Sequence, residues 1–237
     1  MKKTVLPFFK VFIKIISHCI ITRKRAIWIL STYLKYHDFL HRMIIARCGA
    51  KVFNGLHPKN VLNFRSEYFI EKVRPQDVIL DVACGTGLIL KRVSPIIRYG
   101  IGIDYSEKNI ALCKTIHAAE NIEYIHEDIH TFDYIDLKKR TGYNTAIFSH
   151  ILEHIKDVPS ILQRVDANRL IICVPSQENW YTQLLIFFGL PYFKDATHYR
   201  EYTRDMLRKE INSSGYDILS IGFNSEGEIV AVAEKKP

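Results

Sequence analysis

Residues 78–90 read Val78-Ile79-Leu80-Asp81-Val82-Ala83-Cys84-Gly85-Thr86-Gly87-Leu88-Ile89-Leu90. An apolar strand pattern passes directly into a turn with two glycines, and a helical pattern follows the turn. Gly85 and Gly87 allow a ligand to approach the backbone closely, and the N–H groups at the start of a helix point into the same space. The segment therefore predicts a strand–turn–helix unit that binds a nucleotide-like ligand at the turn.

Two further strand patterns end in carboxylates. The strand expected at Tyr99–Ile103 leads into Asp104, where a carboxylate can accept hydrogen bonds from both hydroxyls of a ribose. The strand expected at Ile122–Ile125 leads to Asp128, which could accept a hydrogen bond from the exocyclic amine of an adenine. The carboxyl ends of parallel strands share one edge of a sheet, so these acids and the glycine turn are expected to converge on one nucleoside.

From Asn60 onward, short apolar runs alternate with helical patterns. The runs are Val78–Val82, Tyr99–Ile103, Ile122–Ile125, Thr145–Phe148 and Leu170–Val174, followed by a helix at Thr203–Ser213 and strands at Ile218–Phe223 and Glu228–Val232. Such alternation is typical of β-α-β units around a parallel sheet that is buried on both faces. The alternation lapses over residues 176–200, where we expect an apolar insertion that covers a substrate.

The charge is unevenly distributed along the chain. Residues 1–60 hold 12 basic residues and one acid, a net charge of +11, whereas residues 61–237 hold 21 basic and 24 acidic residues, a net charge of −3. A basic helical extension over residues 1–60 and a globular domain over residues 61–237 follow from this division. No run of about 20 apolar residues is free of charge, so a membrane-spanning helix is not expected.

The basic extension has the pattern of amphipathic helices. Lysines and apolar residues at helical spacing near the N-terminus, and a second helical pattern over Arg25–Arg47 with a stop at Gly49, suggest two such helices. A lysine stripe beside a wide apolar face favours either an anionic membrane surface, bound through residues 1–47, or packing on the chain's own domain. Five cysteines without a Cys-x-x-Cys pair favour a reducing cytoplasm, with the extension reaching the inner face of the membrane.

Several other functions fit the sequence less well. A dinucleotide dehydrogenase would need a third glycine where Leu90 stands, and no Walker loop follows the turn. His37 and His41 have no carboxylate or cysteine partner nearby in sequence. Residues 150–154 read His-x-x-Glu-His, as in inverted zinc peptidases, but a strand ends there instead of a helix continuing. We therefore expect no metal site.

These motifs resemble those of the class I S-adenosylmethionine-dependent methyltransferases. Residues 81–87 look like their first motif, residues 102–106 like the second, and residues 127–129 like the third. Residues 149–155 are similar to the segment after the fourth strand in the branch that includes quinone and other small-molecule methyltransferases, and residues 198–203 to a tail segment of that branch. The resemblance covers about residues 61–233.

The resemblance implies an α/β, Rossmann-like, seven-stranded and mostly parallel sheet, with the last strand antiparallel and helices on both faces. It also implies that S-adenosylmethionine lies across the carboxyl ends of the first strands. Its methionine part would be lined by Asp81, Ala83, Gly85 and Gly87, its ribose held by Asp104, and its adenine faced by Asp128 and Ile129, with Tyr105 and Ser149 completing the site. Ala83 stands where the family often has glycine.

Glu153 and His154 follow the fourth strand and would face the sulfonium of the methyl donor, where they could orient or deprotonate an acceptor hydroxyl. His198, in the apolar insertion, is a further candidate. Each of these residues could instead be a structural hydrogen-bonding group. Methyl transfer itself mainly requires alignment of donor and acceptor and exclusion of water, because the sulfonium is already activated.

The expected function is methyl transfer from S-adenosylmethionine to a small-molecule, glycan or lipid-linked acceptor, at oxygen. One alternative is a non-catalytic scaffold protein that keeps the fold and docks through its N-terminal helices. Another is an RNA methyltransferase that grips phosphates with the basic segment. Binding to nucleic acid is not favoured, since the sequence holds neither a recognised RNA-binding module nor an Asn-Pro-Pro-Tyr-like motif after the fourth strand.

Overall fold

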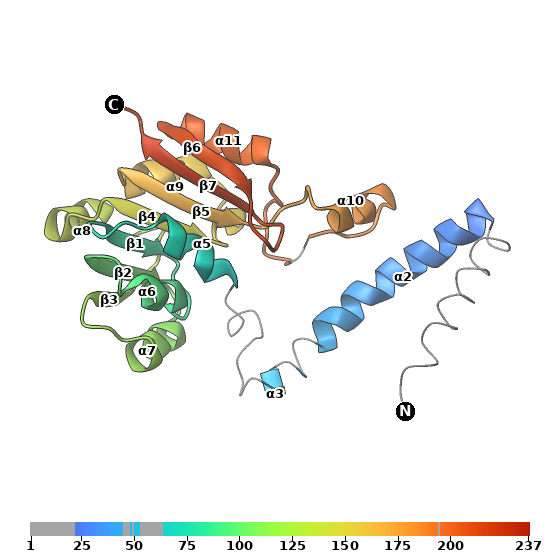
Figure 1. Ribbon diagram of the computed structural model, residues 1–237, viewed down its shortest axis with the longest axis horizontal. Helices are drawn as coiled ribbons and strands as arrows, with labels where there is room; N and C mark the ends of the chain where they lie inside the picture. The colour runs from blue at the N-terminus through green and yellow to red at the C-terminus, as the bar shows by residue number, and fades with distance from the viewer. Residues whose placement is uncertain (1–21, 45–47, 49, 53–63, 194) are drawn as a thin grey trace. The chain divides into compact units, whose positions relative to one another are not determined.

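The computed structural model describes residues 22–44, 48, 50–52, 64–193 and 195–237 (Figure 1). The chain divides into two units, one formed by residues 1–58 with 185–190 and the other by residues 59–184 with 191–237. In the first unit, the helix expected over residues 25–47 is present as α2 (Arg23–Ile44), and a short α3 (Ala50–Val52) follows. The amphipathic helix expected before residue 22 and the stop at Gly49 lie outside the described residues. None of the described helices combines the length and the apolar character needed to cross a bilayer.

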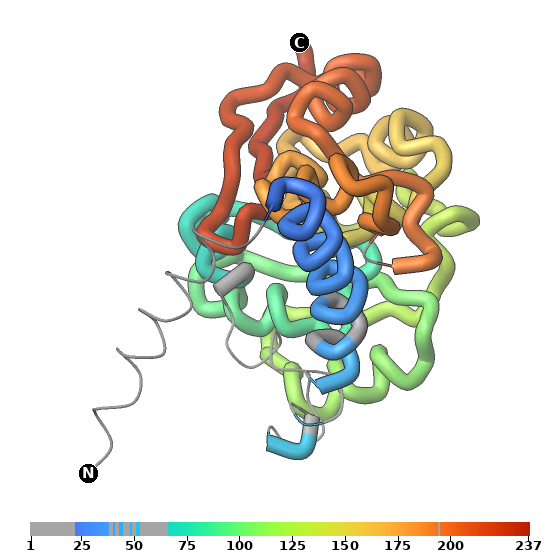
Figure 2. The backbone as a smooth tube through the Cα atoms, turned by 90° about the vertical axis from the view of Figure 1, so that its right-hand side faces the viewer, coloured from blue at the N-terminus to red at the C-terminus, as the bar shows by residue number. Residues whose placement is uncertain are grey.

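The second unit is built on a seven-stranded sheet of order β3-β2-β1-β4-β5-β7-β6. The strands are β1 (Val78–Val82), β2 (Tyr99–Asp104), β3 (Ile122–His126), β4 (Thr145–Ser149), β5 (Arg169–Val174), β6 (Tyr216–Phe223) and β7 (Ile229–Lys235). β1 to β5 pair in parallel, whereas β7 runs antiparallel to both β5 and β6. This confirms the predicted Rossmann-like sheet with an antiparallel last strand. In Figures 1 and 2 the β6–β7 hairpin, in red, forms one side of the sheet and the green β2 and β3 the other.

The sheet is covered by helices on both faces. The helices α5 (Phe64–Lys72), α6 (Leu88–Val93) and α7 (Glu107–Ile116) contribute to one buried cluster, and α8 (Tyr134–Thr141), α9 (Val158–Val165) and α11 (Arg204–Ser213) to a second cluster. Successive strand residues alternate between the clusters: in β5, Leu170 and Ile172 belong to one and Ile171 and Cys173 to the other. A strand buried on both faces must be apolar throughout, which explains the continuous apolar runs in the sequence.

The C-terminal strands are longer than predicted. β6 begins at Tyr216 and β7 continues to Lys235, and the two residues are partners in the antiparallel ladder. On the side of β7 that faces away from β6, Glu234 pairs with Arg169 of β5. The added strand residues do not continue the apolar pattern of the sequence. Their membership in the strands is evident only from their pairing with neighbouring strands. The apolar insertion contains a helix, α10 (Trp180–Phe187).

Glycines in β2 make room for the helix after the turn. A Cβ atom added to Gly102 would lie 2.8 Å from Cys84 Sγ and 3.0 Å from Leu90 Cδ1, and one added to Gly100 would lie 3.0 Å from Leu90 Cδ2. Leu90 occupies the position at which a dinucleotide-binding turn has its third glycine. Close packing of helix on sheet is therefore achieved here by glycines on the strand instead of a glycine on the helix.

Replacement of Gly102 by alanine should destabilise the folded protein by about 1–3 kcal/mol, since the new methyl group overpacks the space shared by Cys84, Tyr124 and Leu90. The matched control is Gly222→Ala in β6, where an added Cβ atom meets nothing within 4 Å. Urea unfolding of both variants measures the difference. Equal midpoints for the two variants would contradict this account of the packing.

Candidate active site

The turn after β1 has an unusual backbone. Ala83, Gly85 and Gly87 have φ angles of 59°, 57° and 76°, in the left-handed region. This conformation costs about 1–2 kcal/mol for a residue with a Cβ atom, such as Ala83. The cost explains why the family that the sequence resembles often has glycine at this position. A Cβ atom on Gly85 would meet nothing within 4 Å, whereas one on Gly87 would lie 2.7 Å from Tyr124 Oη. Gly85 therefore faces open space, and Gly87 is enclosed by the protein.

The carboxylate of Asp104 ties the end of β2 to this turn. One oxygen accepts a hydrogen bond from the Gly85 N–H at 2.9 Å, and the other accepts from the Ser106 N–H at 2.9 Å and the Asn109 side-chain amide at 3.1 Å. Asp104 is only 4% exposed. A carboxylate offers about four lone-pair positions, so the predicted ribose-binding group retains capacity for another donor while it shapes the turn.

Further contacts hold the turn from the side of α7 and β3. The Cys113 thiol donates to the Gly85 carbonyl at 3.3 Å, and the Tyr124 hydroxyl donates to the carbonyl oxygens of Gly87 at 3.3 Å and His117 at 3.0 Å. The four cysteines that the structure describes are free thiols. Because the turn is held by its backbone atoms, its shape depends on these neighbours as much as on its own residues.

Asp81 lies near the end of β1 and is 1% exposed. Its Oδ2 atom is buried and has no hydrogen-bond partner among the described residues. Burial, with a smaller contribution from the nearby Asp104, raises the pKa of the Asp81 carboxyl to about 8. A buried acceptor without a donor is suited to a ligand that brings a positive charge or an N–H group.

The other predicted binding residues lie at the same edge of the sheet. The ring of Tyr105, directly after β2, is 77% exposed. The Asp128 side chain is exposed and accepts a hydrogen bond from the His130 N–H at 2.9 Å, whereas the neighbouring Ile129 is buried in the core. Ser149 ends β4 and is half-buried. The order β3-β2-β1-β4 thus aligns the residues predicted to bind a nucleoside and its attached chain.

The three predicted catalytic residues come together. The rings of His154 and His198 meet edge to face with their centroids 4.5 Å apart. Glu153, His154 and His198 each place one nitrogen or carboxylate oxygen within 4.8 Å of the others. Glu153 is fully buried and both histidines are half-buried. Residues predicted separately, from two distant parts of the sequence, therefore form one cluster.

Each histidine of this cluster is held through its Nδ1 atom. His154 Nδ1 lies 3.0 Å from the Thr197 hydroxyl, and His198 Nδ1 lies 2.8 Å from a carboxylate oxygen of Glu201. Burial, and then the neighbouring His198, lower the pKa of His154. Because Nδ1 of each ring already has a partner, Nε2 is the ring nitrogen that can bind a further group. The lowered pKa keeps His154 in the neutral form, which can accept a proton near pH 7.

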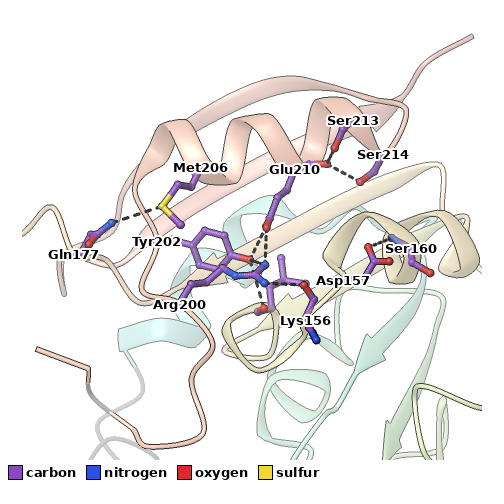
Figure 3. Close-up of polar contacts among 11 residues, drawn as sticks. Lys156, Asp157, Ser160, Gln177, Arg200, Tyr202, Met206, Glu210, Ser213 and Ser214 are labelled. Carbon is purple, nitrogen blue, oxygen red and sulfur yellow. Dashed lines mark hydrogen bonds and ion pairs between the residues drawn. The ribbon is translucent and has the colours of Figure 1, made fainter.

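The tail segment that carries His198 is fastened to the segment after β4, as Figure 3 shows for Arg200, Tyr202 and Glu210. Arg200 donates to the Lys156 carbonyl at 2.8 Å and pairs with Glu210 at 2.5 Å, while the Tyr202 hydroxyl donates to the other Glu210 oxygen at 2.6 Å. The backbone N–H of Tyr199 donates to the Glu153 carbonyl at 2.8 Å. These bonds set the position of His198 beside His154. Thr197, Glu201 and Glu210 were not singled out from the sequence, because their roles depend on this packing.

The helix required by the inverted peptidase pattern does not form over residues 150–154. Only Leu152–His154 is helical, as a single 3₁₀ turn (η2), and His150 has a φ angle of 55°. Two groups of described residues nevertheless have the spacing to hold a metal ion: Glu153 with His154 and His198, and His150 with Cys173 and Glu228. The sequence singles out Glu153, His154 and His198 as catalytic candidates and not as metal ligands, and it does not indicate the second group, because His150, Cys173 and Glu228 lie far apart in the chain.

Known proteins that resemble this chain in sequence or in fold are methyltransferases. Residues 57–221 match the family described as methyltransferase domain. The chain belongs to the class I S-adenosylmethionine-dependent methyltransferases. S-adenosylmethionine is accordingly its cofactor.

The individual proteins that resemble this chain share 30% or less of its sequence over the matched residues. A ubiquinone biosynthesis O-methyltransferase of Bradyrhizobium diazoefficiens is 30% identical over 118 residues, which make up 48% of this chain and 46% of that protein. The match thus spans about half the length of this curated relative. The magnesium protoporphyrin IX methyltransferase of Synechocystis, solved with bound SAH, superposes with a TM-score of 0.58 at 16% identity and covers 84% of this chain and 100% of that one. An S-adenosylmethionine-dependent methyltransferase of Anabaena variabilis gives a TM-score of 0.57 at 18% identity, covering 75% and 85%. At these identities the solved structures establish the fold alone.

The stability of the ligand-free methyltransferase should fall as the pH rises from about 4 to about 8. An aspartate in the unfolded chain loses its proton near pH 3.9, whereas folded Asp81 keeps it up to about pH 8, so the folded state binds the additional proton in this window. Asp81→Asn, which stays neutral, should therefore gain stability relative to the wild type between pH 5 and pH 8. Urea unfolding at both pH values measures this gain, with the exposed Asp217→Asn as the control. Parallel pH dependence of wild type and Asp81→Asn would show that Asp81 ionises normally.

Proposed function

We propose that this methyltransferase transfers a methyl group from S-adenosylmethionine to a hydroxyl oxygen of a small-molecule, glycan or lipid-linked acceptor. The cluster of Glu153, His154 and His198, located after β4 at the carboxyl edge, carries this proposal. A neutral imidazole at that edge can take the proton of a hydroxyl during transfer. The O-methyltransferase name of the curated relative supports an oxygen acceptor, although the match covers only about half of that protein.

The proposed cofactor site uses the residues at the ends of β1, β2 and β3. The buried Asp81 carboxyl would accept from the amino group of the methionine part, and Gly85 would let the ligand approach the backbone. Asp104 would accept from the ribose hydroxyls with its remaining lone pairs, and Tyr105 and Asp128 would flank the adenine. When bound, S-adenosylmethionine supplies a methyl group already activated by the sulfonium.

We assign the proton-accepting role to His154. Its Nδ1 is held by Thr197 at 3.0 Å, so its Nε2 is the atom available to an acceptor hydroxyl. His198 is held by Glu201 and packs edge to face on His154, so it would fix the orientation of the His154 ring. Glu153 is fully buried, and one of its carboxylate oxygens lies within 4.8 Å of a ring nitrogen of each histidine, close enough to stabilise a protonated imidazole.

Replacement of His154 by alanine should lower kcat with a phenolic acceptor about 100-fold to 10,000-fold while the KM for S-adenosylmethionine changes little, because only proton transfer is lost. Mass spectrometry of aromatic acceptors that differ only in carrying a hydroxyl, amino or thiol group identifies the acceptor atom. The exposed His130→Ala is the control and should retain activity. Methylation of the amino or thiol compounds alone would overturn the oxygen proposal, and full activity of His154→Ala would overturn the role of His154.

We also propose that α2 brings the enzyme to an anionic membrane surface. Tyr33, Tyr36, Leu40 and Ile44 are 55%, 63%, 45% and 51% exposed. At 100° per residue they fall within roughly 80° of each other on the helix, and the basic Lys24 and Lys35 lie on the opposite side, together with the exposed Trp28. An exposed apolar face with lysines opposite is the arrangement of helices that lie in a membrane interface. A lipid-linked acceptor would be reached from that position.

The full chain should float with vesicles that contain an anionic phospholipid and should float less with purely zwitterionic vesicles. Replacing Lys24 and Lys35 by glutamate should reduce flotation, since each lysine near an anionic surface contributes about 1 kcal/mol. Replacing the exposed Lys108 and Lys114 of α7 by glutamate changes the net charge equally and should leave flotation unchanged. Equal losses in the two double variants would attribute binding to overall charge and contradict a role for α2.

A further inference from the structure

Three strands bring His150, Cys173 and Glu228 together at the carboxyl edge of the sheet. His150 directly follows β4, Cys173 lies in β5, and Glu228 precedes β7. His150 Nε2 lies 2.9 Å from Glu228 Oε1, and the Cys173 thiol donates to Glu228 Oε2 at 3.3 Å. A nitrogen, a sulfur and an oxygen from the three residues all lie within 4.8 Å of one another. Neither the methyl-donor site nor the proposed base uses these three side chains.

We propose that His150, Cys173 and Glu228 form a binding site for a divalent metal ion of borderline softness, with Zn²⁺ as the best match. Imidazole, thiolate and carboxylate are the protein ligands that Zn²⁺ takes, and a hard cation such as Mg²⁺ would not select a thiolate. On binding, the Cys173 S–H bond breaks as the sulfur–metal bond forms, and the proton leaves to solvent.

The burial of the ligands suits such a site. The side chain of Glu228 is 5% exposed and that of His150 is 24% exposed, and Cys173 is fully buried. An ion would therefore enter past the imidazole and reach two ligands already shielded from water. Three protein ligands leave a fourth tetrahedral position on the exposed side, which a water molecule can fill.

Neighbouring groups orient the ligands as they do around established metal sites. Glu153 Oε1 lies 3.6 Å from the Nδ1 atom of His150, so the ring presents Nε2 to the cluster. The Asn224 amide donates to Glu228 Oε2 at 3.0 Å, and the Asn224 side-chain oxygen accepts from the Glu228 N–H at 2.9 Å. A carboxylate behind a ligating histidine and hydrogen bonds to a ligating carboxylate are the usual outer contacts of bound zinc.

The backbone also holds the two strand-end ligands together. His150 has a φ angle of 55°, a left-handed conformation that persists in a non-glycine residue only where its surroundings enforce it. In this conformation its N–H donates to the Cys173 carbonyl at 2.9 Å. The imidazole is thereby turned toward Cys173 and Glu228.

Cobalt(II) is the probe, because a cysteine thiolate bound to Co²⁺ gives a charge-transfer absorption that histidine and carboxylate ligands do not give. The full chain, stripped with a chelator, is titrated with Co²⁺ alone. We expect one Co²⁺ per chain with the thiolate band, and loss of the band on addition of Zn²⁺. Cys173→Ser should abolish the band, and the matched control Cys113→Ser, an equally buried thiol outside the cluster, should retain it. Asn224→Ala should weaken Co²⁺ binding about 10-fold to 100-fold.

The wild-type spectrum alone can overturn the proposal. A folded chain that binds no Co²⁺, or that binds it without a thiolate band, excludes Cys173 as a ligand. Co²⁺ binding that is lost in His198→Ala and unchanged in Cys173→Ser would place the ion on Glu153, His154 and His198 instead. Far-ultraviolet circular dichroism identifies any variant that fails to fold. Because these readouts need neither methyl donor nor acceptor, their failure is distinct from failure of the proposed function.

Discussion

The carboxylate of Asp104 is the interaction on which the ligand-binding edge of this methyltransferase depends. It joins the end of β2 to the Gly85 N–H and to the start of α7 through Ser106 and Asn109. Without that acceptor, the left-handed turn after β1 would lose the bond that offsets its strain. One side chain therefore shapes the turn and, under the proposed function, keeps lone pairs for the hydroxyls of a ribose.

The proposed acceptor side of the site is assembled differently. His154 and His198 meet only because Arg200, Tyr202 and Glu210 fasten the tail segment to the chain after β4. Fixed positions of these side chains matter for methyl transfer, because alignment of the donor and acceptor supplies much of the rate enhancement. The end of the apolar insertion thus contributes one of the two histidines of this cluster.

Buried acids recur along this edge of the sheet. Asp81, Glu153 and Glu228 are each less than 5% exposed, and the His150 ring lies against both Glu153 and Glu228. Burial of several carboxylates is costly unless protons or cations balance them. For Asp81, a proton and the positive charge of the methyl donor are two ways to achieve that balance, so ligand binding and protonation at Asp81 are expected to be linked.

The sequence by itself determined the sheet and the residues of the proposed donor site, because strand periodicity, the glycine turn and the acids at strand ends are local features that stand a few residues apart. It predicted β1 to β5 within one or two residues of their ends, and it singled out Asp81, Gly85, Gly87 and Asp104. Tertiary structure alone decided which distant side chains meet. Cys173 and Glu228 are 55 residues apart, and His154 and Thr197 are 43 apart. No periodicity encodes such pairs, since strand order and the packing of the tail segment bring them into contact.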